Sequence, residues 1–139
     1  MSSADNLAKL KEAYQLWDET KAGSVEHWMD LLDDSVKFRS LAHGSPGMEF
    51  SQDRSSKAEV VGYMEGLAAD WDMLHYTTDQ FIADGDWVAV LGRCGWRNKH
   101  TDKEIQTPKA DFWRFKDGKI VAFYEFYDTA QVMAAVQQV

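Results

Sequence analysis

The sequence has one cysteine, few prolines and no long apolar run. Since Cys94 is alone, the chain forms no internal disulfide, which is typical of proteins in a reducing cytosol. No stretch reaches the about 18 apolar residues of a membrane-spanning helix, and residues 1–14 lack the apolar core of a signal peptide. We therefore expect a cytoplasmic protein with no membrane partner.

Positive charge is also scarce. Lysine and arginine number 15 against 23 aspartates and glutamates, for a net charge of −8, and no basic cluster interrupts the acidity. A nucleic-acid backbone is a poor partner for such a chain. The four histidines (His27, His43, His75 and His100) are dispersed and show no metal-ligand spacing, so we expect no metal site.

Aromatic residues, in contrast, are abundant. They make up 13% of the chain, with six tryptophans, which indicates a large apolar interior or pocket. The length of 139 residues suits one domain, expected over 1–139, with a sizeable core.

Hydrophobic periodicity predicts helices followed by strands. This order is typical of an α+β fold in which helices cover one face of a curved, mainly antiparallel sheet. We expect helices over 5–21, from Ser24 onward, over 57–71 and over 129–136, and strands over 36–41, 74–83, 86–98, 104–116 and 119–128, with a loop over 42–55.

The closing hairpin, 109–128, carries two carboxylates inside aromatic strands. Asp111 and Glu125 lie among aromatic residues, and an ionised carboxylate in such surroundings is costly unless it is paired. It is either satisfied by a partner or retained because its altered acidity is useful. The aromatic neighbours are Phe112, Trp113, Phe115, Phe123, Phe126 and Tyr127.

Four stretches resemble the nuclear transport factor 2-like superfamily, in its SnoaL-like and ketosteroid-isomerase-like branch. They are AYQLWDETKAGSVEHWMDLLDDSVKFRS (13–40), SKAEVVGYMEGL (56–67), IADGDWVAVLGR (82–93) and the closing hairpin. The resemblance implies a cone in which a bent sheet wraps three N-terminal helices around a deep apolar pocket. It does not assign the chemistry, because one fold hosts many functions.

The resemblance gives Asp111 a candidate catalytic role. It matches the position where ketosteroid isomerases hold a neutral aspartic acid that donates a hydrogen bond to an oxyanion. Apolar surroundings keep such a carboxylic acid protonated. The alternative is that Asp111 pairs with Lys109, Arg97 or a backbone amide.

Glu125 matches an acid–base position of the epoxide-hydrolase and polyketide-cyclase relatives, provided that it faces the pocket. A two-residue turn at 117–118 pairs Asp111 with Tyr124 and turns Glu125 to the outer face. A three-residue turn over 116–118 with a bulge pairs Asp111 with Phe123, so that both carboxylates share a face. We favour the second turn.

Other parts of the isomerase pattern are missing. Ser40 occupies the place of the expected aspartate base, and an alcohol is a poor general base at neutral pH. Tyr14 lies two residues out of step with the oxyanion-hole tyrosine, where Leu16 stands. Steroid isomerisation is therefore not expected.

We expect a chain that binds a small apolar or aromatic molecule and, if it is an enzyme, performs isomerase, cyclase, dehydratase or hydrolase chemistry without a cofactor. The alternative is a non-catalytic binding or dimerisation module, with a homodimer through the outer sheet face at Phe112, Tyr124 and Phe126. The expected catalytic residues are Asp111 and Glu125, and the expected pocket-lining residues are Tyr14, Trp17, Phe38, Ser40, Met64, Trp96, Trp113, Phe123 and Tyr127.

Overall fold

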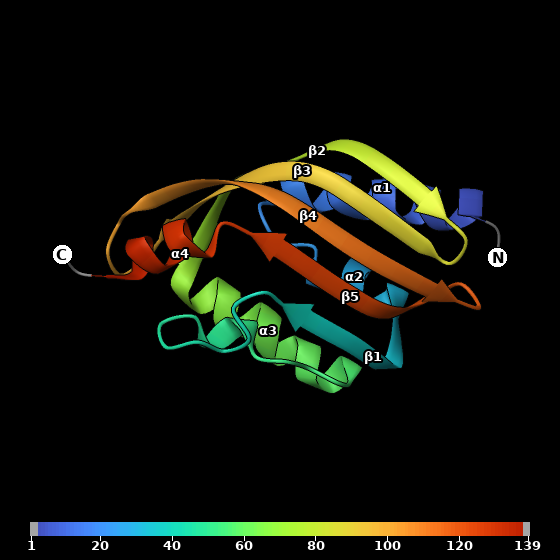
Figure 1. The fold of residues 1–139 in the computed structure, drawn as a ribbon, viewed down its shortest axis with the longest axis horizontal. Helices are drawn as coiled ribbons and strands as arrows, with labels where there is room; N and C mark the ends of the chain where they lie inside the picture. Colours follow the sequence, from blue (N-terminus) through green and yellow to red (C-terminus); the bar gives the residue numbers. More distant parts are fainter. Residues whose placement is uncertain (1–2, 138–139) are drawn as a thin grey trace.

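The computed structural model describes residues 3–137, so that the ends of the expected domain lie outside the described residues. The predicted order of helices and strands is confirmed (Figure 1). The elements are α1 (Ser3–Glu19), α2 (Val25–Leu31), β1 (Leu32–Ser40), the 3₁₀ turn η1 (Glu49–Ser51), α3 (Lys57–Asp70), β2 (Trp71–Asp84), β3 (Trp87–Asn98), β4 (Glu104–Lys116), β5 (Lys119–Tyr127) and α4 (Thr129–Val136).

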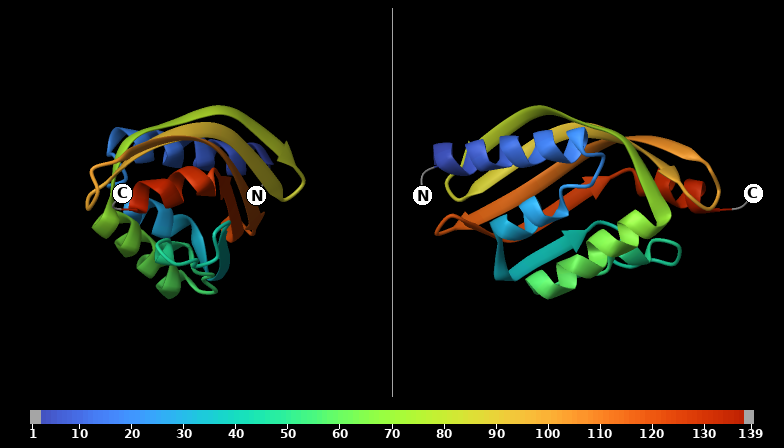
Figure 2. Two further views of the ribbon diagram at one scale, coloured as in Figure 1. Left: turned by 60° about the vertical axis from the view of Figure 1, so that its left-hand side comes forward. Right: turned by 180° about the vertical axis from the view of Figure 1, so that it is seen from behind.

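The strands form one sheet in the order β1-β5-β4-β3-β2, with β1 parallel to β5 and the other pairs antiparallel. Register shifts interrupt the β1–β5, β2–β3 and β4–β5 pairs. Such bulges bend strands and increase their twist. The sheet accordingly curves around the helices, as the left-hand view in Figure 2 shows. The predicted α+β cone is confirmed.

Two strands begin earlier than their sequence pattern predicts. β1 starts at Leu32 instead of 36, and β2 starts at Trp71 instead of 74, so α2 and α3 pass directly into strands. Both residues are buried and pair with neighbouring strands, Leu32 with Ile120 and Trp71 with Asn98. Burial of these residues in the folded protein therefore extends the strands beyond the segments in which apolar and polar residues alternate.

Local hydrogen bonds fix the starts of α3 and α4. The Ser56 side chain accepts from the backbone N–H of Glu59 at the start of α3, and the Asp128 side chain accepts from that of Gln131 at the start of α4. Such caps typically contribute about 1 kcal/mol each. In the predicted loop, Arg54 pairs with Phe38 and closes the loop onto β1.

Candidate active site

The β4–β5 hairpin places Asp111 directly opposite Glu125. Its turn has two residues, Asp117 and Gly118, and both have positive φ, as a tight hairpin turn requires. The ladder then skips Val121, which has no partner on β4. This bulge shifts β5 by one residue, and the shift turns Glu125 toward the face on which Asp111 lies.

Neither pairing expected for this hairpin is the observed one. The turn is the two-residue form, which was expected to pair Asp111 with Tyr124, whereas the three-residue form was expected to pair it with Phe123. The observed bulge lies inside β5 instead of in the turn. The two carboxylates nevertheless share a face, which was the structural consequence expected of the three-residue turn.

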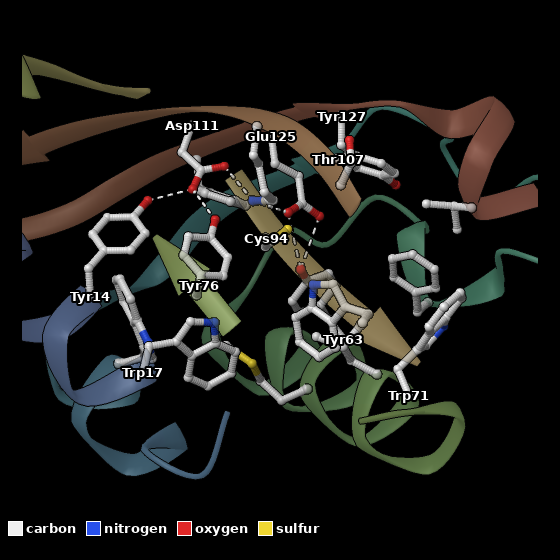
Figure 3. A pocket seen from close by; sticks show the side chains of 18 of the residues that line it. Tyr14, Trp17, Tyr63, Trp71, Tyr76, Cys94, Thr107, Asp111, Glu125 and Tyr127 are labelled. Atoms are coloured by element: carbon white, nitrogen blue, oxygen red, sulfur yellow. Dashed lines mark hydrogen bonds and ion pairs between the residues drawn. The ribbon is translucent and has the colours of Figure 1, made fainter. Parts of the chain in front are cut away.

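Both carboxylates line a pocket enclosed by the sheet and the helices (Figure 3). Each is 3% exposed. Phe50, Leu67 and Tyr127 are among the less buried lining residues. The rest of the lining is mainly aromatic and aliphatic: Tyr14, Trp17, Trp28, Phe38, Tyr63, Met64, Trp71, Tyr76, Cys94, Trp96, Ile105, Thr107, Lys109, Trp113, Phe123 and Val132.

Lys109 joins the two carboxylates. Its Nζ lies 2.5 Å from Oδ1 of Asp111 and 2.8 Å from Oε1 of Glu125, and its side chain is 11% exposed. Burial works to lower the pKa of Lys109, but the charges of Asp111 and Glu125 outweigh it and raise this pKa well above its usual value. Lys109 is therefore an ammonium, and Lys109, Asp111 and Glu125 form what we call the charged cluster.

Three buried tyrosines hold the carboxylates from the helical side and from β2 (Figure 3). Tyr14 Oη donates to Asp111 Oδ2 at 2.5 Å, and Tyr76 Oη donates to the same oxygen at 2.9 Å. Tyr63 Oη lies 3.2 Å and 3.0 Å from the two oxygens of Glu125. Burial, followed by the charge of the neighbouring carboxylate, raises the pKa of each tyrosine well above its usual value, so all three act as neutral donors.

The environment of Asp111 does not match the neutral acid that the family resemblance implied. Oδ1 accepts from the ammonium of Lys109, and Oδ2 accepts from two tyrosines. A carboxyl group surrounded by donors acts as an acceptor, not as a donor to an oxyanion. The ion pair with Lys109, the alternative left open by the sequence, is the observed arrangement.

All of the expected pocket-lining residues except Ser40 line the pocket. Ser40 is buried beside it, and its Oγ lies 2.7 Å from Oη of Tyr127. Its hydroxyl thus supports a lining residue instead of facing the cavity.

Sequence reasoning missed four polar residues of the pocket: Tyr63, Tyr76, Thr107 and Lys109. Lys109 was considered only as an ion partner of Asp111, although strand period two places both on one face. The sequence pattern assigned no polar role to Tyr63 or Tyr76. A hydroxyl group at an otherwise apolar helix position is the signal that could have identified Tyr63.

Two further groups have ordinary structural explanations. Burial raises the pKa of Cys94 to about 11, so its thiol stays protonated at neutral pH. His43 is exposed and lies 2.9 Å from Asp53, away from the pocket lining. Among residues 3–137, no group of three or more His, Cys, Asp or Glu side chains is placed to hold a metal ion. None of the helices described is long and apolar enough to cross a membrane.

Fold and pocket together define a nuclear transport factor 2-like cone. Many solved structures share it, and three of them illustrate the likeness. A nuclear transport factor 2-like protein of unknown function from Burkholderia pseudomallei is 20% identical, with a TM-score of 0.84 and 99% of each chain covered. One from Burkholderia thailandensis is 25% identical, with a TM-score of 0.80 over 99% of this chain and 98% of the other. TerC, co-crystallised with polyporic acid, is 14% identical, with a TM-score of 0.80 over 95% and 98%.

The family model for the SnoaL-like domain matches residues 10–123. The chain therefore belongs to the SnoaL-like domain family. None of the curated proteins matches the sequence.

Proposed function

We propose that this protein binds a small, largely apolar or aromatic organic molecule in the pocket and performs cofactor-free acid–base chemistry on it. One observation carries the proposal: two buried carboxylates share one buried ammonium inside aromatic walls. Burying such a cluster costs more than packing the same volume with apolar side chains. A cluster of this kind in a cavity is a candidate for function.

Glu125 is the base in this proposal. It accepts from Lys109 and Tyr63, whereas Asp111 accepts from Lys109, Tyr14 and Tyr76. Of the two carboxylates, Glu125 therefore loses fewer hydrogen bonds when it takes up a proton. Asp111 holds the ammonium of Lys109 in place.

Lys109 supplies the electrophile. Its two ion pairs use two of its three N–H groups, and the third is available to a ligand oxygen. When Glu125 removes a proton from carbon beside a carbonyl, the C–H electron pair forms a carbon–carbon double bond and the π pair of the carbonyl moves onto its oxygen. The ammonium stabilises the resulting enolate, and Glu125 returns a proton to carbon. Isomerisation, cyclisation and dehydration all use such a step.

The relatives support a small-molecule ligand but not a particular one. TerC, which shares the fold, was co-crystallised with polyporic acid. A ketosteroid-isomerase-like protein from Catenulispora acidiphila was crystallised in complex with trimethylamine.

Hydrogen–deuterium exchange tests the proposal without knowledge of the natural substrate. The probe is 2-tetralone, an aromatic ketone with acidic hydrogens at C1, incubated with the protein in deuterated buffer and followed by mass spectrometry. We expect the wild type to accelerate exchange at C1, and Glu125→Gln to lose the acceleration. Glu26→Gln, a change at an exposed glutamate of α2, is the matched control and keeps it. No acceleration by the wild type, or full acceleration by Glu125→Gln, would overturn the catalytic proposal.

The second candidate is a binding module without catalysis. It is favoured by the completeness of the network, because each oxygen of Asp111 and Glu125 already accepts a hydrogen bond from the chain. Binding of 2-tetralone without accelerated exchange identifies this second function.

We also infer a homodimer through the outer face of the sheet. Several large apolar side chains are more than a third exposed there, which is unusual for a surface without a partner. Two pairs of them touch: Trp87 with Tyr124, and Phe112 with Phe126. The exposed residues are Ile82, Trp87, Leu91, Phe112, Tyr124 and Phe126.

A further inference from the structure

The indole N–H of Trp28 is a hydrogen-bond donor that the fold leaves unused. Trp28 lies on α2, lines the pocket and is 4% exposed. Its Nε1 is buried and has no hydrogen-bond partner. Buried tryptophan N–H groups usually find an acceptor, and leaving one unpaired costs about 1–3 kcal/mol. An unpaired donor on a residue that lines a pocket points to an acceptor supplied by a ligand.

Trp28 is unlike the other residues with unpaired buried atoms, and it is also unlike Trp113, on which it stacks. Three more buried side-chain atoms of the described residues lack partners, in Asn6, Ser24 and Arg54, but none of these residues lines the pocket. Trp113 stacks on Trp28 with 4.9 Å between ring centres and 9° between planes. Its Nε1 donates to Oη of Tyr14 at 2.8 Å. The fold therefore satisfies one indole of the stacked pair and not the other.

Neighbouring rings fix the orientation of Trp28. Besides stacking on Trp113, it meets Tyr14 at 5.3 Å and 85°, and Trp17 at 6.2 Å and 90°. An aromatic face is a much weaker acceptor than a carbonyl or ether oxygen, so these contacts hold the ring without replacing a hydrogen bond. The donor is preorganised, which reduces the entropy that a ligand loses on binding it.

Trp28 belongs to the part of the pocket beside Asp111. It touches Tyr14, and Tyr14 donates to Asp111, whereas Glu125 is held by Tyr63. A ligand whose carbonyl oxygen binds Lys109 and whose ring system extends past Asp111 and Tyr14 has its other end near Trp28.

We propose that Nε1 of Trp28 binds an acceptor oxygen at the end of the substrate remote from the reacting carbonyl. The substrate class is thus an aromatic ketone with a second oxygen function, such as an ether or a second carbonyl, on the opposite side of the ring system. The inference deepens the proposed function and depends on its ligand pocket. Trp28 is a specificity-determining residue, because a site built to donate a hydrogen bond discriminates against a ligand without the acceptor.

Two probes of the same shape test the inference by isothermal titration calorimetry. They are 6-methoxy-2-tetralone and 6-ethyl-2-tetralone, which differ in one ether oxygen. We expect the wild type to bind the methoxy probe roughly 3- to 10-fold more tightly, the range that one neutral hydrogen bond contributes. In Trp28→Phe, which keeps the stacked ring and removes the N–H, the two affinities become equal.

A measurement on the wild type alone keeps the test decisive if Trp28→Phe fails to fold. In a ¹H–¹⁵N spectrum, the indole resonance of Trp28, assigned through backbone connectivities, moves downfield with the methoxy probe and not with the ethyl probe. Equal affinities in the wild type, or a preference retained by Trp28→Phe, overturn the role of Trp28 and leave the pocket intact. Failure of both probes to bind the wild type contradicts the proposed function itself, and the inference fails with it.

Discussion

Asp111 and Glu125 face each other across the β4–β5 ladder and bind the same ammonium, at 2.5 Å and 2.8 Å from Nζ of Lys109. The two carboxylates exceed the single ammonium by one negative charge. The surrounding tyrosines stabilise this excess negative charge by donating hydrogen bonds from their neutral hydroxyl groups. The stability of the pocket and the chemistry that we propose for it therefore involve the same three charged groups.

Replacing Lys109 by methionine is expected to destabilise the protein strongly. It leaves two carboxylates buried without their counter-charge, and breaking a buried ion pair typically costs about 3–5 kcal/mol. The free energy of unfolding, measured by urea denaturation at neutral pH, checks this. The matched control is Lys116→Met at an exposed position of the same strand, where a change within about 0.5 kcal/mol is expected.

The triple variant Lys109→Met, Asp111→Asn, Glu125→Gln separates charge from packing. With all three charges removed, no unpaired ion remains, and neutral or apolar replacements of buried ion pairs often preserve stability. We expect the triple variant to be more stable than Lys109→Met alone. A triple variant that is less stable than the single one would contradict the importance of the uncompensated charge.

Alkaline pH is expected to unfold the protein through its buried tyrosines. Burial raises the pKa of Tyr14, Tyr63 and Tyr76 well above 10.0 in the folded state. Above pH 10 the unfolded chain therefore loses protons that the folded chain keeps, and the free energy of unfolding falls by up to about 1.4 kcal/mol per pH unit for each such group. Lys109, whose folded pKa also lies above its usual 10.5, acts in the same direction.

Urea denaturation at about pH 8 and about pH 11, together with tyrosinate absorbance near 295 nm, checks the pH effect. The stabilising contribution of these groups is complete below pH 10 and is lost as pH rises through their folded-state values. Ionisation of the buried tyrosines should coincide with unfolding. Their ionisation in the folded protein near pH 10 would show that they are not held as neutral donors.

Changing the outer sheet face is expected to dissociate the inferred homodimer. Phe126 is 42% exposed and touches Phe112, so Phe126→Glu places a charge in the apolar contact. Sedimentation equilibrium should then show the mass of one chain, with the free energy of unfolding of the monomer little changed. Val61→Glu, at a 38% exposed position of α3, is the control and should remain dimeric. A wild type that is monomeric at high concentration would contradict the inference.

Ser40 is expected to tolerate loss of its hydroxyl but not a new carboxylate. Ser40→Ala removes the hydrogen bond to Tyr127 and should cost about 1 kcal/mol. Ser40→Asp adds a third buried carboxylate beside Glu125, its partner in the β1–β5 register, and should cost several-fold more. Urea denaturation distinguishes the two. Equal costs would show that the position is open to solvent.

The sequence predicts the order of elements well and the site less well. The bounds of β4 and α4 match the predicted ranges, because turn residues and alternation mark them clearly. The bulge at Val121 lies within the apolar run 120–123, where no glycine or polar residue signals it. The contact between Lys109 and Glu125 depends on that bulge. The unpaired N–H of Trp28 depends on how α1, α2 and β4 pack against one another. Neither follows from local pattern.

A crystal structure of the protein with 6-methoxy-2-tetralone would show whether the charged cluster is a ligand-binding site. We predict the carbonyl oxygen within hydrogen-bond distance, about 2.7–3.2 Å, of Nζ of Lys109, with C1 facing the carboxylate of Glu125. A ligand bound outside the pocket, or inside it with the carbonyl directed away from Lys109, would contradict the account.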